Sequence, residues 1–424
     1  MISRTSPDEA YVWIWLPGAT EPVIAGRLFR DGNRLSFNYG RGYLRRADAI
    51  PLYAPELPLR SGAIPPRNGL HLASCLRDAA PDAWGRRVIL NRLFGVKGRA
   101  AETGSIDELT YLLESGSDRI GALDFQPSPT EYTPRMAQSA TLELLMTAAD
   151  HVDAGISLTP DLDQALLHGT SLGGARPKAM LEENNQKWIA KFSLSSDTYN
   201  MVKAEFIAMR LASRLGLDVA PVRLERVLGR DILLVQRFDR EKTGDGWRRR
   251  AMVSALTLFG LDEMMARYAS YQDLAEIIRH RFTTPTATLR ELFGRLVFNI
   301  LCGNTDDHAR NHAAFWDGAH LTLTPAYDVC PQLRVGHAAS QAMLITGEKR
   351  MSTLANCLEA APHFLLAPDM AWGLIAGQIA RLRTEWDTVC EEATLTEVDK
   401  SLFLQRMFLN PFIFEGSPDR LRPG

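Results

Sequence analysis

The first half of the chain mixes short alternating runs with helical ones. Residues 11–16 are aromatic and β-branched, which predicts a strand. Residues 23–29 and 34–39 are two further strand-like runs, and Asp31-Gly32-Asn33 between them supplies turn residues, so they predict a hairpin. Helical spacing follows over residues 72–94. This pattern predicts a compact α+β unit that reaches to about residue 125.

A polar, proline-rich stretch at residues 126–140 predicts a linker. Helices are expected beyond it at residues 141–151 and 161–167. Residues 178–181 and 188–192 then predict two strands joined by the turn residues Glu183-Asn184-Asn185-Gln186.

The next helix is predicted over residues 202–215, where apolar positions follow helical spacing and Gly216 can end the helix. Residues 222–227 and 231–235 predict a hairpin. From about residue 250 the pattern is overwhelmingly helical, and residues 288–302 show it most clearly. A short strand is expected at residues 320–324, and the last helices at 370–389 and 395–412.

Composition adds only broad limits. A length of 424 residues predicts two or three domains, and 46% apolar with 23% charged residues is typical of a globular protein. The net charge of −2 gives no electrostatic case for broad nucleic-acid or membrane binding. The five scattered cysteines form no C-x-x-C pair, and no run of about 18 apolar residues occurs. A cytoplasmic protein without a membrane partner is therefore the expectation.

The chemistry concentrates in Gly303-Asn304-Thr305-Asp306-Asp307-His308-Ala309-Arg310-Asn311-His312 and in Asp328. Asp306 and Asn311 reproduce the Asp-x-x-x-x-Asn spacing of a protein-kinase catalytic loop, and Asp328 follows where a metal-binding aspartate would fall. In phosphoryl transfer from ATP, one carboxylate orients the acceptor hydroxyl, while an amide oxygen and a second carboxylate hold Mg²⁺. This set predicts such a site.

Three segments before it supply the other parts that a kinase needs. Small residues at 168–175, with Gly173-Gly174, can bring backbone N–H groups close to a polyphosphate. Lys178 and Lys191 on the two following strands can reach the same phosphates as point charges. Residues 236–240 lie where a kinase chain crosses between lobes.

Each part also has an ordinary structural interpretation. Gly173-Gly174 could be a simple turn, Lys191 a solvated lysine, and the Asp306 loop a helix exit. His308 and His312 are four residues apart, as in H-E-x-x-H zinc enzymes, but Ala309 stands where the glutamate belongs. No G-x-S-x-G elbow supports a serine hydrolase. The joint occurrence in kinase order favours the phosphotransfer hypothesis.

The motifs resemble those of the HipA family of toxin kinases. They are Ser171-Leu172-Gly173-Gly174-Ala175-Arg176-Pro177-Lys178, Gln236-Arg237-Phe238-Asp239-Arg240, the run 303–312, and Pro325-Ala326-Tyr327-Asp328. The resemblance implies an α+β, two-lobed kinase-like fold with a mixed α/β N-lobe, a small N-terminal subdomain and an all-helical C-lobe. The expected parts are an N-terminal HipA-like subdomain (1–125), a linker (126–140), an ATP-covering N-lobe (141–240) and a helical catalytic C-lobe (241–424).

The resemblance also implies roles for particular residues. Asp306 would be the catalytic aspartate, and Asn311 and Asp328 the magnesium ligands. ATP would be bound by the loop residues, the two lysines, the inter-lobe segment and one histidine, namely Ser171, Leu172, Gly173, Gly174, Lys178, Lys191, Gln236, Phe238, Asp239 and His308. Ser171 matches the loop serine that this family autophosphorylates.

As implied by the resemblance, the protein is a serine/threonine-protein kinase that uses ATP and Mg²⁺. Its substrate would be a protein, with aminoacyl-tRNA synthetases as the known family example. Its partner would be a small helix-turn-helix antitoxin, so that DNA is met only indirectly. Two alternatives remain open: a small-molecule phosphotransferase, and a non-catalytic nucleotide-sensing partner of a DNA-binding antitoxin.

Overall fold

The computed structural model describes residues 7–94, 106–136, 140–156, 158–167, 170, 174, 176–194, 197–334 and 336–418. The chain divides into two compact units. The first unit comprises residues 1–196, 225–253 and 315–319, and the second comprises residues 197–224, 254–314 and 320–424. This division follows compactness alone, so the expected parts 1–125, 126–140, 141–240 and 241–424 stay a prediction.

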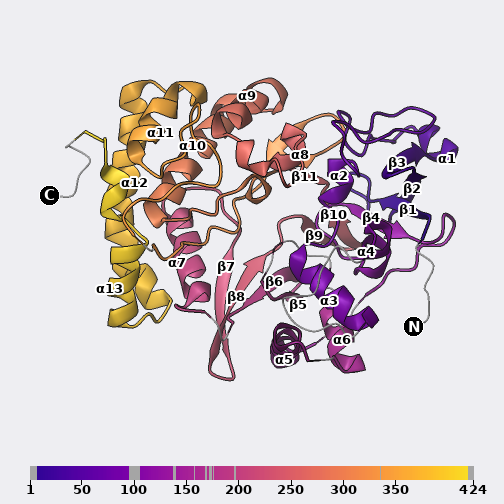
Figure 1. Ribbon diagram of the computed structural model, residues 1–424, viewed down its shortest axis with the longest axis horizontal. Coiled ribbons are helices and arrows are strands. Elements are labelled where there is room, and N and C mark those ends of the chain that lie inside the picture. The colour runs from indigo at the N-terminus through magenta and orange to yellow at the C-terminus, as the bar shows by residue number, and fades with distance from the viewer. Residues whose placement is uncertain are drawn as a thin grey trace. The chain divides into compact units, whose positions relative to one another are not determined.

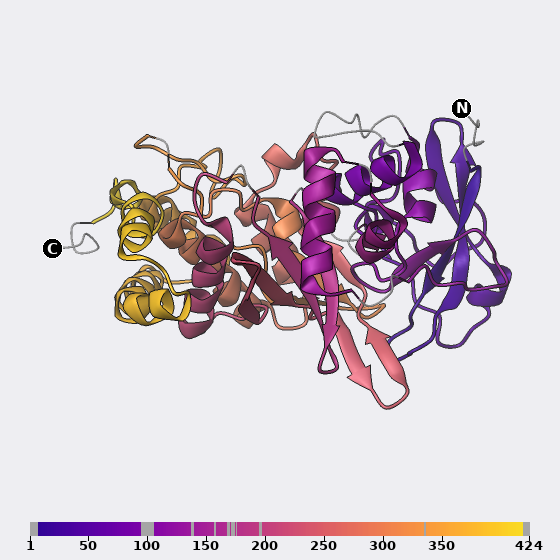
Figure 2. The ribbon, with the colours of Figure 1, turned by 90° about the horizontal axis from the view of Figure 1, so that it is seen from below.

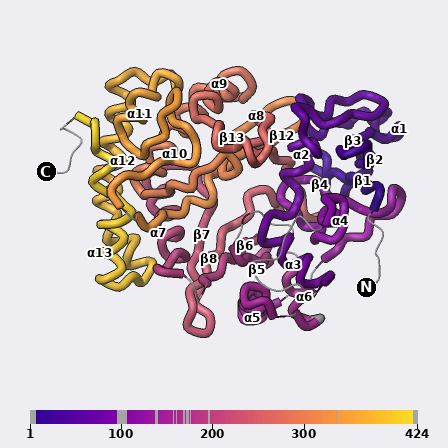
Figure 3. Tube along the Cα trace, viewed as in Figure 1, coloured from indigo at the N-terminus to yellow at the C-terminus, as the bar shows by residue number. Residues whose placement is uncertain are grey.

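The first unit begins with a four-stranded antiparallel sheet in the order β3-β2-β1-β4 (Figures 1 and 3). Its strands are β1 (Glu9–Ile14), β2 (Val23–Asp31), β3 (Arg34–Tyr39) and β4 (Leu123–Gln126). The β2–β3 hairpin expected around Asp31-Gly32-Asn33 is present, with Asp31 paired to Arg34. Short helices accompany the sheet: α1 (Arg41–Leu44), α2 (Ser74–Arg77), α3 (Ala83–Phe94) and α4 (Glu108–Glu114).

The polar stretch after β4 is irregular but is attached to this unit. Described residues 127–136 contain no helix or strand. The ring of Tyr132 lies 5.4 Å from that of Trp13 and 5.6 Å from that of Trp15. Arg135 donates from Nη2 to the Asp124 carboxylate at 3.1 Å. These contacts anchor the stretch on the N-terminal sheet.

A second sheet has the order β5-β6-β8-β7. Its strands are β5 (Lys178–Glu183), β6 (Gln186–Phe192), β7 (Val222–Val227) and β8 (Arg230–Gln236). Both connecting turns adopt the left-handed conformation that tight hairpins require: φ is +52° at Asn184, +59° at Asn185, +50° at Leu228 and +79° at Gly229.

One face of β5, β6 and β8 contributes Ala179, Ala190 and Leu234 to a buried core. That core also contains residues of α3, α5 (Leu142–Ala154) and α6 (Pro160–Leu166), so these helices cover the apolar face (Figure 2). Because side chains alternate along a strand, the neighbouring positions point to the opposite face. Lys178 and Lys191 occupy such positions.

The second unit is mostly helical. The long helix α12 packs against α7, α10 and α11 (Figure 1). The helices of this unit are α7 (Met201–Arg214), α8 (Ala255–Phe259), α9 (Tyr271–Arg281), α10 (Pro285–Cys302), α11 (Leu354–Ala360), α12 (Pro368–Glu392) and α13 (Glu397–Arg406), with 3-10 turns at Ala266–Tyr268, Ala309–Asn311, Ala361–Phe364 and Pro411–Phe414. Gly216 follows α7 with φ at +85°, as predicted.

The expected helical C-lobe, residues 241–424, contains more strands than the one predicted at residues 320–324, which is present as β13 (Leu321–Leu323). A hairpin forms from β9 (Arg240–Thr243) and β10 (Gly246–Arg249), and a three-stranded sheet has the order β11-β12-β13. Its strands are β11 (Met252–Ser254), β12 (Ala313–Trp316) and β13 (Leu321–Leu323). The β9–β10 strands are charged on both faces, so they lack the apolar alternation that would reveal them. Among the described residues, no helix is both long and apolar enough to cross a membrane.

Candidate active site

Helix α10 ends at Gly303, which sets the direction of the loop that follows. Gly303 has φ at +75°, and the Asn304 N–H donates to the Asn299 carbonyl at 2.8 Å, which closes the helix end. A Cβ on Gly303 would lie 2.8 Å from the Met407 carbonyl oxygen. Both the backbone conformation and the close packing therefore require glycine here, and the chain leaves α10 in a fixed direction.

The loop that follows holds itself by backbone bonds. The His308 N–H donates to the Asp306 carbonyl at 2.9 Å, and the Asn311 N–H donates to the His308 carbonyl at 2.8 Å. The Asn311 side chain turns back so that Nδ2 donates to the Asp306 carbonyl at 3.3 Å. Asp306 is exposed as a residue, although its carboxyl group is partly desolvated. The loop thus presents one carboxylate and one amide from the same turn.

Asp328 joins this pair. It follows Ala326, which bridges to Val219, and the Tyr327 hydroxyl donates to the Arg310 carbonyl at 2.7 Å. Asp328 itself has φ at +58°, a conformation that costs free energy in a non-glycine residue. The surrounding backbone therefore fixes its position beside the loop.

The electrostatics show that the carboxylates are neighbours. Burial raises the pKa of Asp306, and the negative charges of Asp328 and Asp307 raise it further, while His308 opposes them. A bound cation would offset the negative charges that raise the pKa of Asp306. The charge of Asp328 thus acts on Asp306, and Asn311 bonds to the Asp306 carbonyl. The catalytic and magnesium-binding roles of these three residues stay predictions.

The donor set suits Mg²⁺. This ion prefers oxygen ligands and is usually held by one or two carboxylates together with substrate phosphates. Asn311 and Asp328 offer an amide and a carboxylate oxygen. Within the described residues, no three His, Cys, Asp or Glu side chains gather as a zinc site would require. His312, one of the two histidines weighed for zinc, is instead buried and hydrogen-bonded to Asp307.

Lys178 and Lys191 lie directly across from each other on two neighbouring strands. Lys178 and Lys191 are partners in the β5–β6 register, so their side chains leave from the same face. Gly174 has φ at +96°, and a Cβ there would lie 2.4 Å from the Lys178 ammonium nitrogen. One loop glycine and the Lys178 charge are thus in close contact. The predicted residues Ser171, Leu172 and Gly173 lie outside the described residues.

Gln236 and Phe238 flank the end of β8. The Arg237 N–H between them donates to the Lys187 carbonyl at 2.8 Å, and the Phe238 ring meets the Phe315 ring edge-on at 5.9 Å. Both side chains are partly exposed. Their expected contact with adenine stays a prediction.

Asp239 lies in a buried ion cluster, which we define as Asp118, Lys187, Arg237, Asp239 and Arg240. The Asp239 carboxylate accepts from Arg237, from Arg240 and from the Gly121 N–H at 2.8 Å. It is 2% exposed. These bonds account for Asp239 structurally and give no support for a nucleotide contact, so that expectation also stays a prediction.

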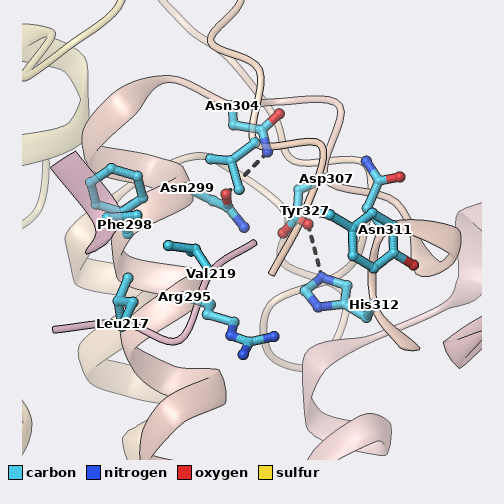
Figure 4. A pocket seen from close by; sticks show the side chains of 12 residues that line it. Leu217, Val219, Arg295, Phe298, Asn299, Asn304, Asp307, Asn311, His312 and Tyr327 are labelled. Carbon is cyan, nitrogen blue, oxygen red and sulfur yellow. Dashed lines mark hydrogen bonds and ion pairs between the residues drawn. The ribbon is translucent and has the colours of Figure 1, made fainter. Parts of the chain in front are cut away.

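Sequence reasoning missed the side chains behind the catalytic loop. A small cavity of about 10 Å³, enough for one water molecule, is lined by Asn299, Asn304, Asp307, Asn311 and His312, among others (Figure 4). Asp307 to His312 repeats the five-residue spacing of Asp306 to Asn311 one position later. That repeated spacing was the available signal.

The chain is similar to two family models and to several known proteins. The family model described as "HipA-like C-terminal domain" matches residues 170–394, and "HipA N-terminal domain" matches residues 15–126. The protein named "Putative kinase Y4mE" of Sinorhizobium fredii is 32% identical over 342 residues, which cover 74% of this chain and 76% of that protein. The serine/threonine-protein kinase toxin HipA of Shewanella oneidensis is 28% identical over 183 residues, 38% of this chain and 42% of that one.

A solved structure of Shewanella oneidensis HipA, in complex with HipB and its operator DNA, is similar to this chain. The TM-score is 0.68 at 20% sequence identity, with 92% of this chain and 94% of that chain covered. This likeness confirms the predicted α+β, kinase-like fold.

Proposed function

Because the chain belongs to the HipA family, we propose that it is an ATP- and Mg²⁺-dependent serine/threonine-protein kinase. The observation that carries the proposal is the grouping of Asp306, Asn311 and Asp328, in which burial and neighbouring carboxylates raise the pKa of Asp306. A raised pKa suits a carboxylate that receives a proton near neutral pH.

The roles follow from the chemistry of the side chains. Asp306 orients the acceptor hydroxyl and takes its proton as the hydroxyl oxygen bonds to the γ-phosphorus. The bond from that phosphorus to the β–γ bridging oxygen breaks, and ADP leaves. Asn311 and Asp328 would hold Mg²⁺, which would supply positive charge to the phosphate oxygens. Lys178 and Lys191 add two more cationic groups for the same phosphates.

Regulation and partners belong to the same proposal. Ser171, in the segment that precedes Gly174, is the candidate autophosphorylation site. The Shewanella relative was solved with HipB and operator DNA, and we propose that a small helix-turn-helix antitoxin likewise binds this chain. DNA would be bound through that antitoxin. A protein substrate such as an aminoacyl-tRNA synthetase would carry the acceptor hydroxyl.

The test is transfer of labelled γ-phosphate by the purified full-length protein, offered a bacterial lysate and separately a panel of metabolites. We expect labelled protein, and a fall of several orders of magnitude in rate for Asp306→Asn with nucleotide binding nearly unchanged. Asp369→Asn, at an exposed position in the first turn of α12, is the matched control and should keep the parent rate. Labelling of a metabolite alone would favour a small-molecule kinase instead.

A cellular test addresses the toxin role. Expression in a bacterium should arrest growth, and Asp328→Ala should relieve the arrest because it removes a proposed magnesium ligand. Arrest that persists in this variant would contradict a kinase-dependent toxin and favour a non-catalytic role.

A further inference from the structure

Each proposed functional residue of the loop is followed by a buried one. Asp306 is exposed, whereas Asp307 is 2% exposed; Asn311 is partly exposed, whereas His312 is 4% exposed. Asp307 and His312 therefore both point inward. There His312 Nε2 lies 2.8 Å from Asp307 Oδ1 (Figure 4).

This inner contact has a third member. The Tyr271 hydroxyl, at the start of α9, hydrogen-bonds to Asp307 Oδ2. An ionised carboxylate can only accept, so Tyr271 and His312 both act as donors to Asp307. Tyr271 is fully buried, and burial followed by the Asp307 charge holds its pKa well above its ordinary value. We name Tyr271, Asp307 and His312 the clasp.

The clasp is tied to the end of α10. Asn299 Nδ2 donates to the Tyr271 hydroxyl at 3.3 Å, and Asn304 Nδ2 donates to Asn299 Oδ1 at 3.0 Å. Gln341 Nε2 in turn donates to the Asn304 carbonyl at 3.1 Å. A hydrogen-bonded chain therefore runs from the helix end to the inner side of the loop. Buried hydrogen-bonded networks of this kind favour one geometry. Two oxygens of this one, Asn304 Oδ1 and Gln341 Oε1, are buried without a hydrogen-bond partner among the described residues.

We propose that the clasp positions Asp306 relative to Asn311, and so sets the separation between the proton acceptor and a magnesium ligand. This inference rests on the proposed kinase function. Asp307 and His312 stand directly after the two residues concerned, so their bond fixes both ends of the loop at once. The small cavity beside them, about the size of one water molecule, leaves room for these side chains to move when the bond is lost.

Tyr271→Phe tests the proposal, because it removes one hydroxyl and keeps the ring. Tyr43→Phe is the control: Tyr43 is also a buried tyrosine, 2% exposed in the first unit, and its hydroxyl donates to the Ile50 carbonyl at 2.7 Å. We expect Tyr271→Phe to lower kcat by about tenfold to a hundredfold, as misplacement of reacting groups by about 1 Å does. The KM for ATP should stay within about twofold, and the control should keep its kcat.

Two histidine variants guard against simple misfolding. His312→Gln places an amide N–H near the position of Nε2 and should retain most of the activity, whereas His312→Met removes the donor at similar volume and should not. Equal loss in both variants would show that packing, not the bond to Asp307, matters, and would overturn the proposal.

Hydrogen–deuterium exchange of residues 304–312 supplies a readout without catalysis. Exchange should rise in Tyr271→Phe and stay unchanged in Tyr43→Phe, because only the first loosens the loop. If the parent protein transfers no phosphoryl group, the proposed kinase function fails, and the exchange rates alone then show whether the clasp orders the loop. Unchanged exchange together with unchanged kcat in Tyr271→Phe would overturn the proposal that the clasp positions Asp306.

Discussion

Replacement of Asp118 by asparagine probes the ion cluster of the first unit most directly. The Asp118 carboxylate accepts from Lys187, from Arg237 at 3.2 Å and from Arg240 at 2.9 Å, and its side chain is 2% exposed. An amide preserves the shape and one acceptor oxygen but removes the charge. Three buried cations would then share the single carboxylate of Asp239 within this cluster.

The size of the effect follows from that burial. Removing one partner of a buried ion pair typically costs about 3–5 kcal/mol, because the remaining charge is left without compensation. The Arg237 and Arg240 side chains are each 1% exposed, so water cannot replace the lost carboxylate. We expect Asp118→Asn to lower the free energy of unfolding of the first unit by about 3–5 kcal/mol, a large share of ordinary stability.

Urea unfolding followed by tryptophan fluorescence measures this loss. Asp48→Asn is the control, since Asp48 pairs with Arg46 at the surface with its side chain 61% exposed; it should leave the midpoint of unfolding nearly unchanged, because water screens exposed ion pairs. A loss below about 1 kcal/mol for Asp118→Asn would refute the assignment of a buried, charge-dependent cluster.

The pH dependence gives a second check. Burial would raise the pKa of Asp118, but Arg237, Arg240 and Lys187 overcome it and hold this pKa well below its ordinary value. A depressed pKa contributes stability above the unfolded value of about 3.9 and loses it as the pH falls through the folded value. The difference between parent and variant should therefore be constant from about pH 6 to 8 and shrink below about pH 4. A difference that does not shrink would contradict this reasoning.

Two further predictions concern the catalytic loop. Burial and Asp328 raise the pKa of Asp306, and the charge of His308 lowers it. His308→Gln should therefore raise the pKa of Asp306 further and move the acid limb of the pH–rate profile to higher pH. A ¹³C NMR titration of the Asp306 carboxyl measures this pKa, and an unchanged pKa would contradict the prediction. Gly303→Ala should cost more than the roughly 1–2 kcal/mol of left-handed strain, because a backbone carbonyl lies 2.8 Å from the new methyl group. Gly216→Ala, with φ at +85° and open space around it, should show the strain alone in thermal unfolding; equal losses would refute the packing argument.

Local signals were sufficient for much of the fold. The β2–β3 hairpin, the β5–β6 turn at Asn184-Asn185 and the end of α10 at Gly303 all depend on residues a few positions apart. The same holds for the Asp306-to-Asn311 spacing, whose two members bond within one loop; their predicted roles, and that of Asp328, stay predictions. These features were predictable because turn chemistry and periodicity are properties of short segments.

Features made by distant residues were not predictable in this way. Asp118 and Arg237 are 119 positions apart, and nothing local to either indicates that the other will neutralise it. Tyr271 and Asp307 are separated by 36 positions, so the clasp depends on how α9 packs beside α10. The nucleotide contacts of the two lysines, of Gln236, Phe238 and Asp239, and of residues 171–173 stay predictions.

The inward bond between Asp307 and His312 has a consequence for how the catalytic loop tolerates change. The quantity under constraint is the number of residues between these two, because the loop must close so that their side chains meet. A substitution at the partly exposed Arg310 leaves that number unchanged. A single inserted or deleted residue between Asp307 and His312 alters it, and shifts Asp306 and Asn311 relative to each other. Length, more than local identity, is what this loop must inherit unchanged.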